Sequence, residues 1–233
     1  MALFLQLLER FPPARLVDLG TGHGMFARLA ADRGWDVTAV DARAERFPND
    51  SRVRWVNQDV RQIALDDFDV VACLGLWYHL TLADQEGLVE RAGGAPLIID
   101  THVAHDRLAD HGSHRKGLSK VKKVGDYSGR YYGERHLQDR FTASFGNDLS
   151  FWPTEDSLRA MLLAGSYDLV ESIDPPVAPD RRFFLATSIG SERARVLDEA
   201  ISTYIPWARR GQPGEKPRVD LRAADPSHDV VAR

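Results

Sequence analysis

Short apolar runs alternate with turn residues and helical stretches along the first part of the chain. Residues 15–24 predict a strand that runs into a glycine-rich loop. Further runs rich in valine, leucine and isoleucine predict buried strands at 36–42, 53–59, 68–80 and 96–103. Residues 25–34 and 82–93 carry apolar side chains at helical spacing. A strand, a glycine loop and a helix in succession indicate the first unit of a doubly wound α/β sheet.

The second half of the chain supplies closing elements for such a sheet. Residues 154–166 predict a helix capped at Thr154, with acids in its first turn, where the helix dipole favours them. Runs at 167–173 and 181–188 predict a closing pair of strands. Residues 1–11 are apolar but lack the basic leader of a signal peptide, so they predict an amphipathic capping helix.

Residues 104–150 form one unusually long connection, since loops beyond about 12–15 residues are uncommon unless they are functional or disordered. This segment contains three tyrosines, four histidines and most of the lysines, and we interpret it as a lid over the acceptor site. We expect one domain over residues 1–190, lid included, followed by a C-terminal helix and tail over 191–233. That helix would dock on the domain or, in a homodimer, on a second subunit.

The spacing of the glycine loop separates two cofactor classes. Gly20, Gly22 and Gly24 stand at every second position. The dinucleotide fingerprint G-x-G-x-x-G would need a glycine where the chain has Met25. The pattern D-x-G-x-G-x-G, which begins at Asp18, instead resembles the first motif of class I S-adenosylmethionine-dependent methyltransferases. This resemblance implies a Rossmann-like seven-stranded sheet with one antiparallel strand in the closing hairpin, and S-adenosylmethionine as the cofactor.

The resemblance also implies a cofactor site at the strand ends. Asp41 ends the second strand and is placed to accept hydrogen bonds from both ribose hydroxyls. An acid at the position of Asp59 usually faces the adenine amine in this family, with Gln58 or Val60 beside the ring. The predicted cofactor-binding residues are Asp18, Gly20, Gly22, Asp41, Gln58, Asp59, Val60, Cys73 and Leu74.

A second resemblance rests on residues 74–80 (LGLWYHL), 98–103 (IIDTHV) and 150–173. These segments resemble a methyltransferase subgroup that includes the enzymes modifying the wobble uridine of transfer RNA. They share a Tyr-His pair after the fourth strand and an aromatic-x-Pro-Thr entry to the late helix. The sequence shows no counterpart of the long N-terminal extension of those enzymes. A lid-bearing chain of this length is closer to the small-molecule and sugar O-methyltransferases of actinobacteria.

The residues after the fourth strand favour an oxygen acceptor. The turn Leu76-Trp77-Tyr78-His79 lacks the Asn/Asp-Pro-Pro-aromatic motif typical of amine methylation. Cys73 lies mid-strand and is expected in the core rather than as a thiolate nucleophile. Transfer to a hydroxyl needs a general base, or a metal that lowers the pKa of the hydroxyl.

Three histidines compete as the base, the strand-end His102 and His79 and, at the start of the lid, His105. We favour His102 or His79, and for each the alternative is a structural role. Asp100 and His102 share a face of the fifth strand and, with Glu134 of the lid, could coordinate Mg²⁺. Because Mg²⁺ prefers carboxylates to histidine, this metal site stays an alternative to a histidine base. The predicted substrate-binding residues are Tyr78, His105, Tyr131 and Tyr132.

Composition limits the binding partners and the cellular compartment that we expect for this protein. The formal net charge of −4 gives no global basic field for nucleic acid or membranes. The lysines and tyrosines of the lid resemble a site for single-stranded nucleic acid. Acidic residues are interspersed among them, so a solvated loop explains the composition at least as well. A single cysteine fits a reducing cytoplasm, and no apolar run is long enough to span a membrane.

We therefore expect a cytoplasmic S-adenosylmethionine-dependent O-methyltransferase that acts on a small molecule or saccharide. Three alternatives stay open: a transfer RNA methyltransferase, a nicotinamide oxidoreductase on the same scaffold, and a non-catalytic cofactor-binding protein.

Overall fold

The computed structural model describes residues 1–105, 118–134, 144–175 and 181–189, all within one compact unit, Met1–Glu192. The predicted C-terminal helix and tail lie outside the described residues, as do His111, His114 and His136 of the predicted lid.

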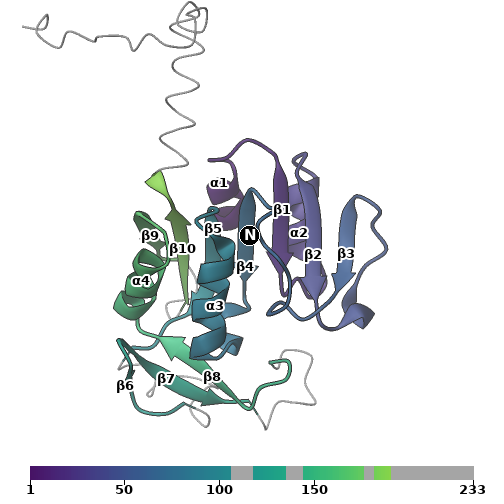
Figure 1. Ribbon diagram of the computed structural model, residues 1–233. Coiled ribbons are helices and arrows are strands. Elements are labelled where there is room, and N and C mark those ends of the chain that lie inside the picture. Colours follow the sequence, from purple (N-terminus) through teal and green to yellow (C-terminus); the bar gives the residue numbers. More distant parts are fainter. Residues whose placement is uncertain (106–117, 135–143, 176–180, 190–233) are drawn as a thin grey trace, which may run out of the picture. The chain divides into compact units, whose positions relative to one another are not determined.

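Seven strands form the central sheet in the order β3-β2-β1-β4-β5-β10-β9 (Figure 1). Its five parallel strands are β1 (Arg15–Leu19), β2 (Asp36–Asp41), β3 (Val53–Asn57), β4 (Val70–Leu74) and β5 (Leu97–His102). β10 (Arg181–Thr187) lies antiparallel to both β5 and β9 (Leu169–Ile173). This confirms the predicted seven-stranded sheet with one antiparallel strand.

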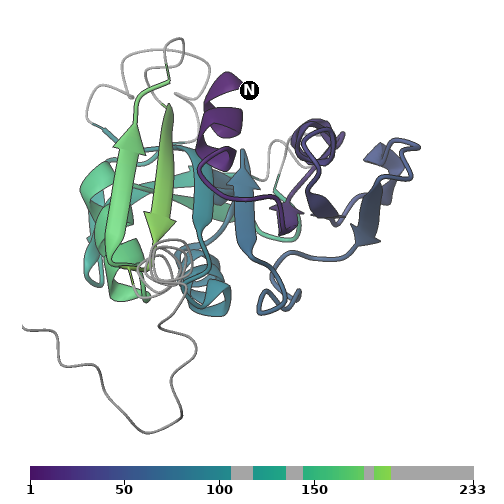
Figure 2. The ribbon, with the colours of Figure 1, turned by 90° about the horizontal axis from the view of Figure 1, so that it is seen from above.

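Helices cover both faces of the sheet (Figure 2). α1 (Ala2–Leu8) and α2 (Met25–Ala31) pack on one face, and α3 (Leu82–Ala92) and α4 (Glu155–Ala164) on the other. Successive side chains of a strand point to opposite faces, so Leu16 packs in the α1 and α2 core while Val17 packs in the α3 and α4 core. Thr154 caps α4 as predicted, because its hydroxyl accepts a hydrogen bond from the Ser157 N–H at 3.2 Å.

The fourth strand is shorter than the predicted 68–80. β4 ends at Leu74, Gly75 adopts a φ of +81°, and Trp77–His79 form the 3₁₀ turn η2. A left-handed φ favours glycine and ends the pleat. Trp77 is nonetheless fully buried, so the apolar run continues into the core without continuing the strand. β3 likewise ends before Asp59, which lies in the following turn.

The insertion after β5 contains a second sheet that the apolar pattern did not predict. β6 (Lys122–Val124), β7 (Tyr127–Gly133) and β8 (Leu149–Pro153) are antiparallel and lie beyond the carboxyl ends of the central strands (Figure 1). The Phe151 N–H donates to the Leu80 carbonyl at 2.9 Å, and the Ala104 N–H donates to the Pro153 carbonyl at 2.8 Å. These bonds attach the small sheet to the edge where ligands bind in open α/β folds.

Contact between α3 and α4 depends on a glycine. A Cβ on Gly165 would lie 2.0 Å from Val89 Cγ1. Gly165→Ala is therefore expected to lower the free energy of unfolding by about 1–3 kcal/mol through overpacking. Gly87→Ala is the control: it lies within α3 with a flexible arginine as its nearest neighbour, and should raise stability by roughly 0.5–1 kcal/mol. Urea unfolding measures the free energy of unfolding of both variants. If Gly165→Ala and Gly87→Ala changed it equally and in the same direction, this account of the packing would be wrong.

Candidate functional site

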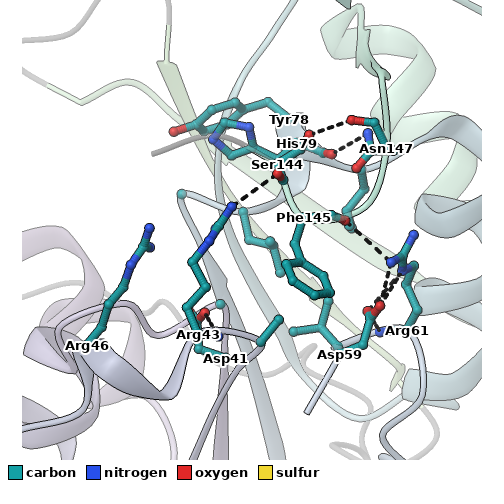
Figure 3. Close-up of a pocket in the computed structure, with 16 residues that line it drawn as sticks. Asp41, Arg43, Arg46, Asp59, Arg61, Tyr78, His79, Ser144, Phe145 and Asn147 are labelled. Carbon is teal, nitrogen blue, oxygen red and sulfur yellow. Dashed lines mark hydrogen bonds and ion pairs between the residues drawn. The ribbon is translucent and has the colours of Figure 1, made fainter. Parts of the chain in front are cut away.

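A cavity of about 210 Å³ lies at the carboxyl ends of the central strands (Figure 3). Its wall combines the glycine loop, the turns after β2 and β3, η2, and a short segment of the insertion. The lining residues are Gly20, Asp41, Ala42, Arg43, Arg46, Asp59, Val60, Arg61, Gly75, Leu76, Tyr78, His79, Leu80, Ser144, Phe145 and Asn147.

Among the predicted cofactor residues, Asp41 meets the glycine loop directly. Its Oδ2 accepts a hydrogen bond from the Gly22 N–H at 2.9 Å, and its Oδ1 accepts one from the Arg43 N–H, also at 2.9 Å. Each carboxylate oxygen has a second lone pair, so Asp41 keeps acceptor capacity for ribose hydroxyls. These bonds fix the carboxylate in the cavity wall.

The three glycines of the loop serve different purposes. A Cβ on Gly20 would lie 3.0 Å from the side chain of Leu76, and one on Gly24 would lie 2.2 Å from the Trp55 ring. Those two glycines therefore allow close packing within the protein. A Cβ on Gly22 would meet nothing within 4 Å, and Gly20 is the glycine of the three that lines the cavity in the described part of the chain.

Asp18 lies beneath the loop and is not among the described residues that line the cavity. It is 2% exposed, and the Thr21 hydroxyl donates to its Oδ2 at 2.6 Å. Burial raises the pKa of Asp18 to about 7, although the bond from Thr21 opposes the shift. Asp18 was predicted to contact the cofactor. In the structure its carboxylate instead accepts a hydrogen bond from Thr21 of the glycine loop.

Asp59 forms an ion pair at the far end of the cavity. The Arg61 Nε donates to both of its carboxylate oxygens, at 2.9 and 3.0 Å, and holds the pKa of Asp59 below its ordinary value. Val60 lines the cavity beside it. Gln58, Cys73 and Leu74 are not among the described lining residues.

Cys73 is fully buried in the core, where desolvation raises the pKa of its thiol, so the predicted core position is confirmed.

His79 lines the cavity and forms a polar pair with Glu134, which is not among the described lining residues. His79 Nδ1 lies 2.9 Å from Glu134 Oε1, and the Glu134 side chain is 0% exposed. Glu134 also accepts hydrogen bonds from the Ser150 hydroxyl at 2.9 Å and from the Ser144 N–H at 3.4 Å. A carboxylate on Nδ1 favours the tautomer with Nδ1–H, which leaves Nε2 as a proton acceptor.

His102 lies behind this wall and does not line the cavity in the described part of the chain. Its ring stacks on Trp152 with centroids 4.8 Å apart and an interplanar angle of 9°. It also packs edge to face with the Tyr78 ring, with centroids 4.6 Å apart. Tyr78, a predicted substrate-binding residue, lines the cavity, whereas His102, 7% exposed, is placed as a packed core residue. This geometry disfavours His102 as the base.

The three predicted metal ligands do not form a metal cluster. Arg181 binds Asp100 through two contacts, Nε to Oδ1 at 2.9 Å and Nη2 to Oδ2 at 2.7 Å, and Glu134 binds His79. Within the described ranges no group of three or more His, Cys, Asp or Glu side chains is arranged to hold a metal ion. The predicted Mg²⁺ site at Asp100, His102 and Glu134 therefore has no support in this geometry.

The other predicted substrate contacts lie away from the cavity wall. Tyr132 packs with Trp152 in a small apolar cluster, and Tyr131 contacts the edge of Phe151 at 5.5 Å. The backbone carbonyl of His105 accepts a hydrogen bond from Arg130 at 3.1 Å.

The lining residues that the sequence did not predict include Ser144, Phe145 and Asn147 of the insertion. No motif marks these residues. Arg61 and Arg43 also line the cavity, and each stands two residues after a predicted acid, a spacing that could have indicated them.

Asp18 gives a testable pH dependence. Its carboxyl holds a proton in the folded state that the unfolded chain releases above about pH 4. The folded state then binds more protons, so the free energy of unfolding falls as the pH rises towards 7. Asp18→Asn cannot ionise and keeps an acceptor for Thr21. Its stability relative to wild type should rise by roughly 2 kcal/mol from pH 5 to pH 8 in urea unfolding. The exposed Asp36→Asn is the matched control, and parallel stability curves for wild type and Asp18→Asn would refute the assignment.

Comparison with known proteins gives a family match to part of the chain. Residues 1–95 match the model of a methyltransferase domain family. A search of curated proteins found no significant match. In the part of the chain that the structure describes, no helix has the length and apolar character needed to cross a membrane.

Solved structures share the fold at low sequence identity. The N-terminal domain of EvdMO1 with SAH bound has a TM-score of 0.60 and 19% identity, over 79% of this chain and 78% of that chain. The same domain has also been solved in the presence of SAH and D-fucose. The 1,6-didemethyltoxoflavin-N1-methyltransferase of Burkholderia thailandensis has a TM-score of 0.52 and 19% identity, over 80% and 76% of the two chains.

The glycopeptide N-methyltransferase MtfA, complexed with S-adenosylhomocysteine, has a TM-score of 0.52 and 18% identity, over 80% of this chain and 86% of that chain. With the strand order described above, these likenesses show that the chain has the Rossmann-like fold of the class I methyltransferases.

Proposed function

We propose that this protein is an S-adenosylmethionine-dependent O-methyltransferase that acts on a hydroxyl of a small molecule or saccharide. The observation that carries the proposal is the His79 and Glu134 pair, because it places an oriented proton acceptor on the cavity that also holds Asp41 and Asp59.

The residues of the cavity fit the donor chemically. Gly20 brings the loop backbone to the cavity wall, Asp41 offers acceptors to ribose hydroxyls, and Asp59 offers acceptors to an amine such as that of adenine. Apolar side chains of Val60, Leu76 and Leu80 complete the wall. When bound, S-adenosylmethionine would supply an activated methyl group. The match of residues 1–95 to a methyltransferase domain supports this donor.

His79 would remove the acceptor proton. As the acceptor oxygen forms its bond to the methyl carbon and the carbon–sulfur bond breaks, the hydroxyl proton passes to His79 Nε2. Glu134 holds the Nδ1–H and stabilises the imidazolium that results. A thioether, a methyl ether and a proton on the histidine are the products, so charge and atoms balance.

The acceptor class draws support from neighbours of the same fold. The EvdMO1 domain was solved with D-fucose present, which is consistent with a saccharide, whereas two other neighbours are N-methyltransferases. An amine acceptor is therefore the competing outcome of the experiments. A protonated amine must also lose a proton before it attacks, so the identity of the methylated product, rather than dependence on His79 alone, discriminates between the two.

Donor binding is tested first by thermal shift. Wild type should be stabilised by S-adenosylmethionine and by S-adenosylhomocysteine, by about 2.7 kcal/mol at a ligand concentration one hundred times the Kd, and not by NADH. Asp41→Ala should lose most of that stabilisation, whereas Asp36→Ala, at the exposed start of the same strand, should retain it. Stabilisation by NADH alone would identify an oxidoreductase and reject the proposal.

The base is tested by transfer of labelled methyl from S-adenosylmethionine to a panel of catechols, monosaccharides and primary amines. His79→Asn should lower transfer to hydroxyls by about 10²–10⁴-fold, while its Kd for S-adenosylhomocysteine stays within twofold of wild type. Glu134→Gln should give an intermediate loss, and its imidazole ¹⁵N spectrum should show that His79 no longer favours one tautomer. Unchanged hydroxyl transfer in His79→Asn, or labelling of amines alone, would refute O-methylation through this base.

A further inference from the structure

We propose that Phe145 binds the adenine ring of the donor, so that the insertion supplies part of the donor site. This inference rests on the proposed function, since it assigns a new contact to the same donor. The strap is defined here as residues 144–147, which connect the insertion to the cavity.

Phe145 occupies an unusual place for an aromatic side chain. It is 50% exposed and yet lines the cavity together with Asp59 and Val60. In the view of Figure 3 its ring points into the cavity between Asp41 and Asp59. Covering an exposed ring with a flat apolar group is favourable, because apolar surface leaves water on both sides.

The surroundings of the ring suit a purine. Ala42, Val60 and Leu80 offer apolar surface on the same cavity wall, and Asp59 offers carboxylate oxygens near it. Adenine has two apolar faces and an amine at its edge, so it needs flat apolar contacts together with an acceptor. The described residues provide both kinds of group in one cavity.

Two arginines fix the backbone that carries the ring. The Arg43 Nη2 donates to the Ser144 carbonyl at 3.2 Å, and the Arg61 Nη2 donates to the Phe145 carbonyl at 3.4 Å. Arg61 is also the partner of Asp59. One guanidinium therefore sets the position of Phe145 relative to the carboxylate that would face the adenine amine.

The other end of the strap is attached to η2. The Asn147 Nδ2 donates to the His79 carbonyl at 3.1 Å and to the Leu149 carbonyl at 2.9 Å. Within the strap, the Ser144 hydroxyl donates to the Asn147 carbonyl at 2.9 Å. Because both ends are held, the ring of Phe145 is presented to the cavity by an anchored segment.

Isothermal titration with two probes tests the assignment. S-adenosylhomocysteine carries the whole donor skeleton, and 5′-methylthioadenosine carries the adenine and ribose without the amino acid. Phe145→Ala should weaken both ligands by the same factor, about 5- to 150-fold, because stacking on a base contributes about 1–3 kcal/mol. Phe145→Tyr keeps the ring and should bind both within threefold of wild type.

The matched control is Leu149→Ala, which removes another exposed apolar side chain of the insertion outside the cavity wall. It should leave both affinities unchanged. The melting temperature of each unliganded variant shows whether a lost affinity reflects unfolding.

Two results would overturn the assignment: wild-type affinity of Phe145→Ala for both ligands, or a loss for S-adenosylhomocysteine without a loss for 5′-methylthioadenosine. The second would place the ring at the amino-acid half of the donor. If wild type itself binds neither probe, the proposed donor is wrong and both proposals fail. That outcome appears with wild type alone, whereas a failure of the Phe145 assignment appears only in the variants.

Discussion

The buried carboxylate of Glu134 is the constraint on which the arrangement of the site depends. Removing a charged group from water costs several kcal/mol unless partners replace the lost hydration. Glu134 finds such partners in His79, Ser150 and the backbone of Ser144. These residues belong to η2, β8 and the strap, while Glu134 itself follows β7. The small sheet, the strap and the histidine therefore hold their positions together, because moving one of them would leave the carboxylate without a partner.

The central sheet provides the second part of the arrangement. Its order reverses between β1 and β4, and the cavity lies where their carboxyl ends diverge, as expected for open α/β folds. On the far side of β5 the antiparallel strand β10 supplies Arg181, which neutralises Asp100. Because of this ion pair, Asp100 at the end of β5 is engaged within the protein and is not among the described residues that line the cavity. Among those lining residues the histidine is His79 of η2.

Local patterns in the sequence predicted the fold well and the site in part. The glycine loop and Asp41 were found because strand, turn and acid are adjacent in the chain and their roles follow from short-range geometry. The predicted extent of β4 was too long. Trp77 is apolar and buried, and the sequence alone does not show whether such a residue belongs to a strand or to a 3₁₀ turn. Glu134 was singled out as a metal ligand, but its contact with His79 spans 55 positions along the chain, and no spacing rule encodes it. The place of Phe145 depends likewise on Arg61, which lies 84 positions away.

The attachment of the strap has a consequence for how this protein can diversify. In many enzymes a loop that recognises one substrate can be exchanged without touching the rest of the active site. Here the strap is bonded both to Arg61, the partner of Asp59, and to the backbone of His79. Replacing the whole insertion would therefore remove contacts on two sides of the cavity at once. A change to the insertion that leaves the cavity wall intact therefore has to keep the strap and Glu134, so in its bonding the insertion is an integral part of the domain and not an exchangeable module.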